Sequence, residues 1–192
     1  MREPENVAQV QKIGIDMMGF IFYDKSPRYV AQAPCTKNVA RVGVFVNEDA
    51  DKITAIAMAN NLTHIQLHGS ETPALCAQIR KKGYKVIKAI NIKEAQDLTV
   101  AKAYEGIVDY LLFDTKCTQH GGSGKTFDWE LLNFYKGSSP FLLSGGIKVE
   151  LAECIKQLKH PQLVGVDLNS GFEISPAHKD ITSLTTFINK IQ

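Results

Sequence analysis

The chain has 192 residues, of which 44% are hydrophobic, and a formal net charge of +2 at pH 7. This length and composition predict one domain, residues 1–192, with a sizeable core. The small net charge argues against a nucleic-acid or membrane-surface partner. We find no signal peptide, no long apolar span and no metal-binding pattern among the four cysteines, so we expect a cytoplasmic protein with reduced thiols.

Short apolar runs and helical patterns alternate along the chain at a step of roughly 20 to 25 residues. Strands are predicted at 17–23, 41–46, 63–67, 84–90, 109–114, 141–143 and 163–167. Helices are predicted at 4–13, 47–60, 71–82 and 93–104, from 129 onward, and at 149–158 and 180–191. Strands that are short and apolar throughout are typical of a parallel sheet covered on both faces.

Two architectures fit this alternation: an open doubly wound sheet and a closed (β/α)8 TIM barrel. The barrel is favoured because polar or glycine-rich stretches follow nearly every strand, and the loops after the strands of a barrel share one face. The chain begins with a helix, and about eight helical segments, one of them a short one not given above, accompany only about seven strands. We therefore predict a (β/α)8 TIM barrel with its first strand absent from the chain as given.

Residues 109–129 combine the features of an active site. A buried strand ends on Asp114, and a glycine-rich loop at 121–124 follows it. Asp128 is placed to cap a helix that begins at Trp129. Parallel α/β proteins build active sites from strand ends of this kind. The alternative is that Asp114 only caps a turn, which is a common role for aspartate.

Glycines follow two neighbouring strands near the end of the chain. Gly145 and Gly146 follow the first of them, and Ser170 and Gly171 follow the second. In a barrel these would be the seventh and eighth strands, whose exits commonly hold a phosphate through backbone N–H groups. The alternative is that the glycines only make tight turns, but their paired arrangement favours a phosphate site.

Other polar side chains follow the remaining strands. Arg28 can clamp a carboxylate with two hydrogen bonds, although alone it also fits an ordinary surface arginine. His68 fits a strand-end histidine, and Lys88 points either into the barrel or toward the helices. Besides Asp167, Asp114 is the one strong candidate for proton transfer at these strand ends. The basic groups and the phosphate turns together indicate a small anionic substrate.

Six parts of the chain resemble one known family, in order and from Met1 to the last helix. They are residues 19–23 with 25–29, 42–47, 66–69, 114–116 with 121–129, 143–146, and 166–171. The family is phosphoribosylanthranilate isomerase of tryptophan biosynthesis, a branch of aromatic amino-acid biosynthesis. The resemblance implies a (β/α)8 barrel that performs an Amadori rearrangement of N-(5-phosphoribosyl)anthranilate to 1-(2-carboxyphenylamino)-1-deoxyribulose 5-phosphate. It also implies that no metal and no organic cofactor takes part.

The resemblance also assigns roles by position. Asp114 would be the general acid that protonates the furanose ring oxygen. Arg28 would hold the anthranilate carboxylate, His68 would lie near the anthranilate, and Asp167 would contact the sugar hydroxyls. The phosphate would be held by Gly145, Gly146, Ser170 and Gly171. The expected partner is a small phosphorylated anion, and we expect a monomer or a homodimer.

The chain departs from the family pattern at its start. The family's first strand ends in Cys-Gly-Met-Arg or a close variant, and its cysteine is the general base that removes the sugar C2 proton. Met1 and Arg2 align with the end of that motif, so the cysteine would precede Met1. General-base catalysis contributes about 10²- to 10⁴-fold. We therefore predict that the activity of the chain as given is low or absent.

Three alternatives bear on this missing base. Cys117 is near Asp114 in the sequence, but it follows a different strand and is disfavoured as a replacement. Met1 is an internal methionine if the natural protein starts upstream. A different class of function is a catalytically silent barrel that binds a phosphorylated ligand. Other sugar-phosphate isomerases and indole-glycerol-phosphate synthase are disfavoured because residues 114–129 fit the first family closely.

Overall fold

Seven parallel strands form the main sheet of the computed structural model, which describes residues 1–115 and 129–192. The strands are β1 (Met17–Ile21), β2 (Ala40–Phe45), β3 (His64–Leu67), β4 (Lys85–Ile92), β5 (Tyr110–Thr115), β6 (Phe141–Ser144) and β7 (Leu163–Val166). Each strand pairs in parallel with the next strand in the chain. This order is that of a TIM barrel, whereas a doubly wound sheet reverses its strand order at a switch point.

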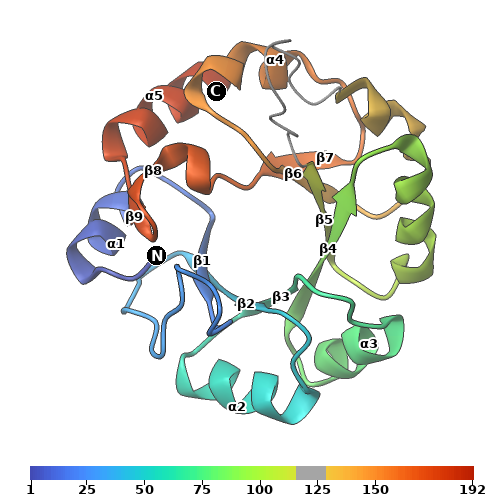
Figure 1. Cartoon of the computed structure of the whole chain (residues 1–192), viewed down its shortest axis with the longest axis horizontal. Helices are drawn as coiled ribbons and strands as arrows, with labels where there is room; N and C mark the ends of the chain where they lie inside the picture. The colour runs from blue at the N-terminus through green and yellow to red at the C-terminus, as the bar shows by residue number, and fades with distance from the viewer. Residues whose placement is uncertain (116–128) are drawn as a thin grey trace.

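Helices lie outside the curled sheet (Figure 1). The α-helices are α1 (Pro4–Gln11), α2 (Ala50–Ala59), α3 (Pro73–Lys81), α4 (Ala152–Gln157) and α5 (Ile181–Ile191). Asp49, Thr72 and Asp180 cap the N-termini of α2, α3 and α5 by accepting hydrogen bonds from backbone N–H groups. None of the helices in the described ranges has the length and apolar character needed to cross a lipid bilayer.

Shorter 3-10 helices complete the outer layer. They are η1 (Ala95–Tyr104), η2 (Trp129–Phe134), η3 (Val149–Leu151) and η4 (Ser170–Phe172). The helix predicted at 93–104 is thus a 3-10 helix, and its buried residues Leu98, Ala101 and Tyr104 recur at every third position. That spacing matches the three-residue period of a 3-10 helix. The predicted loop at 121–124, the predicted cap Asp128 and Cys117 lie outside the described residues.

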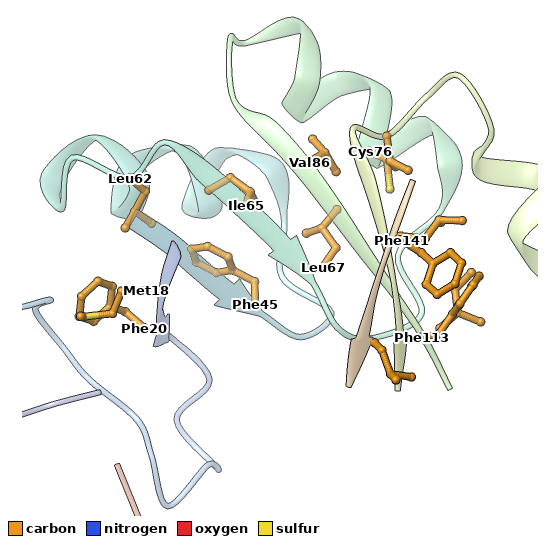
Figure 2. Packing of buried hydrophobic residues seen from close by; sticks show 14 of the residues in the cluster. Met18, Phe20, Phe45, Leu62, Ile65, Leu67, Cys76, Val86, Phe113 and Phe141 are labelled. Atoms are coloured by element: carbon orange, nitrogen blue, oxygen red, sulfur yellow. The ribbon is translucent and has the colours of Figure 1, made fainter. Parts of the chain in front are cut away.

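The strands β2 to β6 carry buried residues on both faces. The larger core cluster fills the space between sheet and helices and contains Phe45, Phe113 and Phe141, part of which Figure 2 shows. A smaller cluster of Val42, Ile87, Ala89 and Leu112 lies on the opposite face. Because successive side chains of a strand point to opposite faces, Leu112 faces inward between Leu111 and Phe113, which belong to the outer cluster.

The side of the ring between β1 and β7 differs from the rest. These two strands are the ends of the strand order, and no pairing between them occurs in the described part of the chain. The N-terminus and the antiparallel hairpin of β8 (Glu173–Ser175) and β9 (His178–Lys179) lie on this side (Figure 1). The amino group of Met1 donates a hydrogen bond to the Gly19 carbonyl of β1 over 3.2 Å. A curled, TIM-barrel-like parallel sheet is therefore confirmed, and the eighth strand stays a prediction.

Candidate active site

The strands and the loops that follow them surround a cavity of about 1250 Å³. One part of its wall is the smaller apolar cluster on the inner face of the strands, including Val42, Ile87 and Leu112. Its wall also contains every residue predicted for the site: Arg28, His68, Asp114, Gly145, Gly146, Asp167, Ser170 and Gly171. Residues of β1 and β7 line the same cavity, which exceeds the usual 300 to 1,000 Å³ of ligand pockets. The fold thus brings together eight side chains or turns from five different strand exits.

Asp114 and His68 approach each other across the mouth of the cavity. His68 Nε2 lies 3.4 Å from Asp114 Oδ2, and the aspartate side chain is 20% exposed. The other ring nitrogen of His68, Nδ1, lies 3.0 Å from Gln66 Nε2. An amide nitrogen only donates, so Nδ1 accepts and Nε2 carries the proton toward Asp114. His68 is therefore placed to donate to one oxygen of Asp114, and among the described residues no partner is found for the other oxygen, Oδ1.

Gln66 was not predicted as part of the site. It is buried on β3, two residues before His68. Residues two apart in a strand share a face. A polar residue at that spacing from a candidate histidine was therefore a usable signal, although the sequence alone does not show that the two side chains meet.

Asp167 is held by its neighbour strand. Its side-chain Oδ2 accepts a hydrogen bond from Ser144 Oγ over 3.0 Å. Ser144 is also the register partner of Asp114 in the β5–β6 pair. Thr115 Oγ1 in turn donates to the Ser144 carbonyl over 2.8 Å. Ser144 thus links the exits of β5, β6 and β7, a role that the sequence did not reveal.

The two glycine turns pack backbone to backbone. Gly145 has φ +95° and Gly146 has φ +60°, a region that side chains rarely adopt. A Cβ atom at Gly145 would collide with the backbone of Thr115, and one at Gly171 would collide with the Ile147 carbonyl. The loops after β6 and β7 therefore touch. The structure contains both turns, and it is compatible with the tight-turn interpretation and with the phosphate interpretation.

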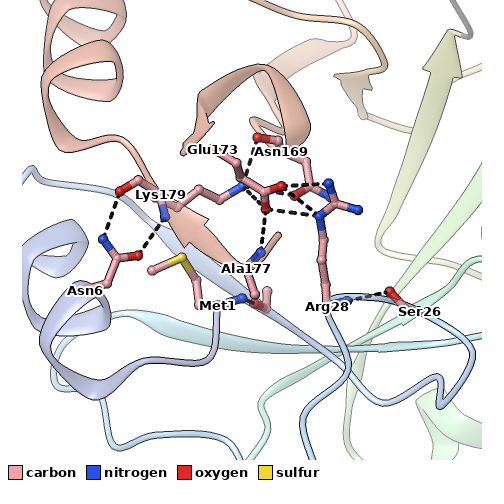
Figure 3. Close-up of polar contacts among 9 residues, drawn as sticks. Met1, Asn6, Ser26, Arg28, Asn169, Glu173, Ala177 and Lys179 are labelled. Carbon is pink, nitrogen blue, oxygen red and sulfur yellow. Dashed lines mark hydrogen bonds and ion pairs between the residues drawn. The ribbon is translucent and has the colours of Figure 1, made fainter. Parts of the chain in front are cut away.

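Arg28 is not an ordinary surface arginine. Its Nε lies 3.0 Å and 2.9 Å from the two carboxylate oxygens of Glu173, and its Nη2 lies 2.6 Å from Oε2 (Figure 3). Lys179 Nζ approaches Oε1 of the same carboxylate at 3.3 Å. Burial would raise the pKa of Glu173, but the hydrogen bond from Arg28 and the charge of Lys179 outweigh it and lower that pKa. Glu173 and Lys179 were missed because they lie on a hairpin too short to show periodicity.

Lys88 points toward the helix layer and not into the cavity. Its Nζ lies 2.9 Å from Glu71 Oε2 and 2.7 Å from the Gly69 carbonyl, beneath the loop that carries His68. Its ammonium also lies 5.9 Å from the ring centre of Tyr104. The side chains of Lys88 and Glu71 are 3% and 1% exposed. This pair supports the exit of β3 from behind.

Three cysteines lie in the described ranges. Cys35 and Cys154 are exposed, and Cys76 is buried in α3. Burial raises the pKa of the Cys76 thiol to about 11, which leaves it protonated at neutral pH. These three thiols are not part of the cavity wall, so none of them is placed to act as a base there.

Known proteins match this chain over nearly its whole length. The family model described as N-(5'phosphoribosyl)anthranilate (PRA) isomerase matches residues 1–190. The N-(5'-phosphoribosyl)anthranilate isomerase of Phocaeicola vulgatus is 48% identical and aligns over 100% of this chain and 95% of its own length. The crystal structure of phosphoribosyl anthranilate isomerase from Thermotoga maritima has a TM-score of 0.84 and 35% identity, with 100% and 95% of the two chains covered.

Another phosphoribosyl anthranilate isomerase was solved in complex with reduced 1-(o-carboxyphenylamino)-1-deoxyribulose 5-phosphate. Its TM-score is 0.83 at 32% identity, with 98% of this chain and 93% of that chain covered. The family model, this relative and both of these solved structures name the same activity. The chain therefore belongs to the N-(5'-phosphoribosyl)anthranilate isomerase family.

Proposed function

We propose that this protein rearranges N-(5-phosphoribosyl)anthranilate to 1-(2-carboxyphenylamino)-1-deoxyribulose 5-phosphate, with Asp114 as the general acid. The observation that carries the proposal is that Asp114 shares one cavity with Arg28 and with the touching turns at Gly145 and Gly171. The cavity thus offers a proton donor, a cation for a carboxylate and backbone groups for a phosphate, which are the three features that this substrate requires.

The first chemical step is opening of the furanose ring. The lone pair of the anilino nitrogen forms a double bond to C1 while the bond from C1 to the ring oxygen breaks. Asp114 gives its proton to that oxygen and becomes a carboxylate. His68 Nε2–H then faces the new charge at Oδ2, where a hydrogen bond to an ion is stronger than one to a neutral acid. Removal of the C2 proton by a base next yields an enolamine, which tautomerises to the aminoketone product.

Substrate binding in this proposal uses both sides of the cavity. Arg28 pairs with the carboxylate of the anthranilate, and His68 lies beside its ring. Asp167, oriented by Ser144, accepts hydrogen bonds from the sugar hydroxyls. The phosphate lies over the turns formed by Gly145, Gly146, Ser170 and Gly171. A monomer or homodimer and a cytoplasmic location remain predictions.

We infer that the strand completing the barrel, with the cysteine base at its carboxyl end, belongs between β1 and β7. Both strands present an edge there in the described residues, and the amino group of Met1 already bonds to the Gly19 carbonyl on the β1 edge. The three described thiols are not part of the cavity wall, so the proposal assigns the base to no described cysteine, and low or absent turnover of the 192 residues as given stays a prediction.

The test compares the 192-residue chain with the same chain extended before Met1 by a strand ending in Cys-Gly. The extension is expected to raise turnover by at least about 10²-fold, the usual contribution of a general base. Asp114→Asn in the extended chain should lower turnover by a similar factor. Full activity of the unextended chain would refute the missing base. An extended chain that binds inorganic phosphate but never turns over would support the silent barrel instead.

A further inference from the structure

Glu173 joins the two ends of the open ring. It follows β7, whereas Arg28 lies in the loop after β1, 145 residues away in sequence. The Glu173 side chain is 5% exposed, and both of its oxygens bind the Nε–Nη2 edge of the guanidinium. Paired hydrogen bonds between a carboxylate and a guanidinium fix direction as well as distance. The position of Glu173 therefore determines how Arg28 is oriented.

The carboxylate of Glu173 is itself firmly held. Lys179 Nζ and the Ala177 backbone N–H each lie 3.3 Å from its Oε1. Lys179 Nζ also donates to the carbonyl and the side-chain oxygen of Asn169 at 3.0 Å and 2.9 Å. The backbone of Lys179 exchanges two hydrogen bonds, of 2.8 Å and 2.9 Å, with the buried Asn6 side chain of α1. Glu173 is therefore held by contacts that do not involve Arg28.

The orientation of Arg28 turns its second edge away from Glu173. Figure 3 shows one guanidinium nitrogen, the one not bound to Glu173, pointing away from the carboxylate. In residues 1–115 and 129–192 no hydrogen-bond partner is found for this Nη1 atom. Guanidinium has five N–H groups, so Nη1 and the remaining hydrogen of Nη2 form a second fork. Arg28 lines the cavity, so that fork can receive a ligand carboxylate.

We propose that Glu173, held by Lys179, is a positioning residue that orients Arg28 so that its Nη1–Nη2 edge selects a carboxylate-bearing substrate. This inference rests on the proposed function, since it assigns the carboxylate of the same substrate to Arg28. It competes with a second interpretation, in which Glu173 occupies the carboxylate site and blocks it. The two interpretations predict opposite changes when Glu173 loses its charge.

The test measures the affinity of the purified chain for two probes, 2-aminobenzoate and inorganic phosphate. Glu173→Gln keeps the size of the side chain but loses the paired ionic contact. The expected result is roughly tenfold weaker binding of 2-aminobenzoate and unchanged binding of phosphate. Glu153→Gln, an exposed carboxyl group on α4, is the control and should alter neither affinity. In an Arg28→Met background, Glu173→Gln should have no further effect on 2-aminobenzoate.

Several outcomes would overturn the proposal. Tighter binding of 2-aminobenzoate would show that Glu173 blocks the site or acts only through its long-range charge. Equal losses for both probes would show a structural role of the hairpin. No change, or a wild-type chain whose 2-aminobenzoate affinity does not depend on Arg28, would also refute it. Glu173→Asp, which keeps the charge and shortens the reach, provides the same test if the glutamine variant does not fold. Because the probes bind without turnover, failure of the isomerase proposal is seen separately.

Discussion

Two ion pairs lie close to the strand exits, one behind the sheet and one at the cavity, and they differ in what they support. Lys88 and Glu71 lie within the continuous part of the sheet, under the exit of β3. Arg28 and Glu173 lie across its two ends. The first pair is sealed off, with side chains 3% and 1% exposed, whereas Arg28 is 22% exposed and lines the cavity. The same kind of contact thus supports a loop in one place and presents a cation to a ligand in the other.

The partners of the two carboxylates explain this difference. Glu71 accepts hydrogen bonds from the backbone N–H groups of Asn47 and Gly69 as well as from Lys88. The Lys88–Glu71 pair therefore connects the loops that follow the neighbouring strands β2 and β3. Glu173 instead divides its charge between two cations, Arg28 and Lys179. The Asp167 carboxylate also acts on Lys179, so the charges around Glu173 are nearly balanced, and what remains available to a ligand is the second edge of Arg28. The partly exposed guanidinium therefore separates the recognition pair from the support pair.

Lys88→Met gives the largest expected effect and tests the supporting role. It leaves the buried Glu71 carboxylate without its cation, and breaking a buried pair in this way costs about 3 to 5 kcal/mol. Urea unfolding should show this loss in the free energy of unfolding. The double variant Lys88→Met with Glu71→Gln should recover part of it, because no unpaired charge remains. A loss below about 1 kcal/mol would show that the pair does not support the fold.

Gln66→Leu tests whether the hydrogen bond from Gln66 orients His68, separately from the support that Lys88 and Glu71 give to its loop. It leaves the Lys88–Glu71 pair intact but removes the donor to His68 Nδ1. The neutral ring is then free to move its proton to Nδ1, and turnover of the extended chain should fall by roughly tenfold. Imidazole nitrogen-15 shifts at about pH 8 should report the Nε2–H tautomer in the parent chain and a mixture in the variant. An Nδ1–H tautomer in the parent would contradict the assigned role of Gln66.

The sequence predicted the sheet because short apolar runs with polar exits are a local signal, and each run became one of the strands β1 to β7. It predicted the candidate residues at the strand exits for the same reason. Arg28, Asp114 and Asp167 all follow apolar runs, and the fold needs only to curl the sheet for them to meet. For η1 the sequence predicted a helix without its type, although the three-residue spacing of its buried residues indicates a 3-10 helix.

The sequence did not predict Glu173 as part of the site, because its contact with Arg28 forms only when the two ends of the sheet come together. Glu173 meets Arg28 only because the first and last strand exits are neighbours, and no local pattern encodes a contact 145 residues apart. Lys88 posed a related problem, because a lysine within an apolar strand is compatible with either face of the sheet. Its direction is settled by Glu71 and Tyr104, which follow β3 and β4. Local sequence predicts where polar groups leave the core, but not which of them pair.

The smallest expected effect is a change in acid sensitivity that the two carboxylates share. Burial alone would raise the pKa of Glu71, but hydrogen bonds from Asn47 and Lys88 lower it on balance. Burial would likewise raise the pKa of Glu173, but Arg28 and Lys179 lower it. A folded-state pKa below the ordinary 4.5 stabilises the fold above that pH, and this stabilisation is lost as the pH falls through the folded-state value. Urea unfolding between about pH 5 and pH 3 should therefore show a shallower fall for Glu71→Gln and for Glu173→Gln than for the parent, with Glu153→Gln as the control. The slope for Glu173→Gln should change less, because Arg28 stays partly in solvent and weakens the contact. If the free energy of unfolding falls equally with pH in the parent and in both variants, neither ion pair contributes to acid sensitivity.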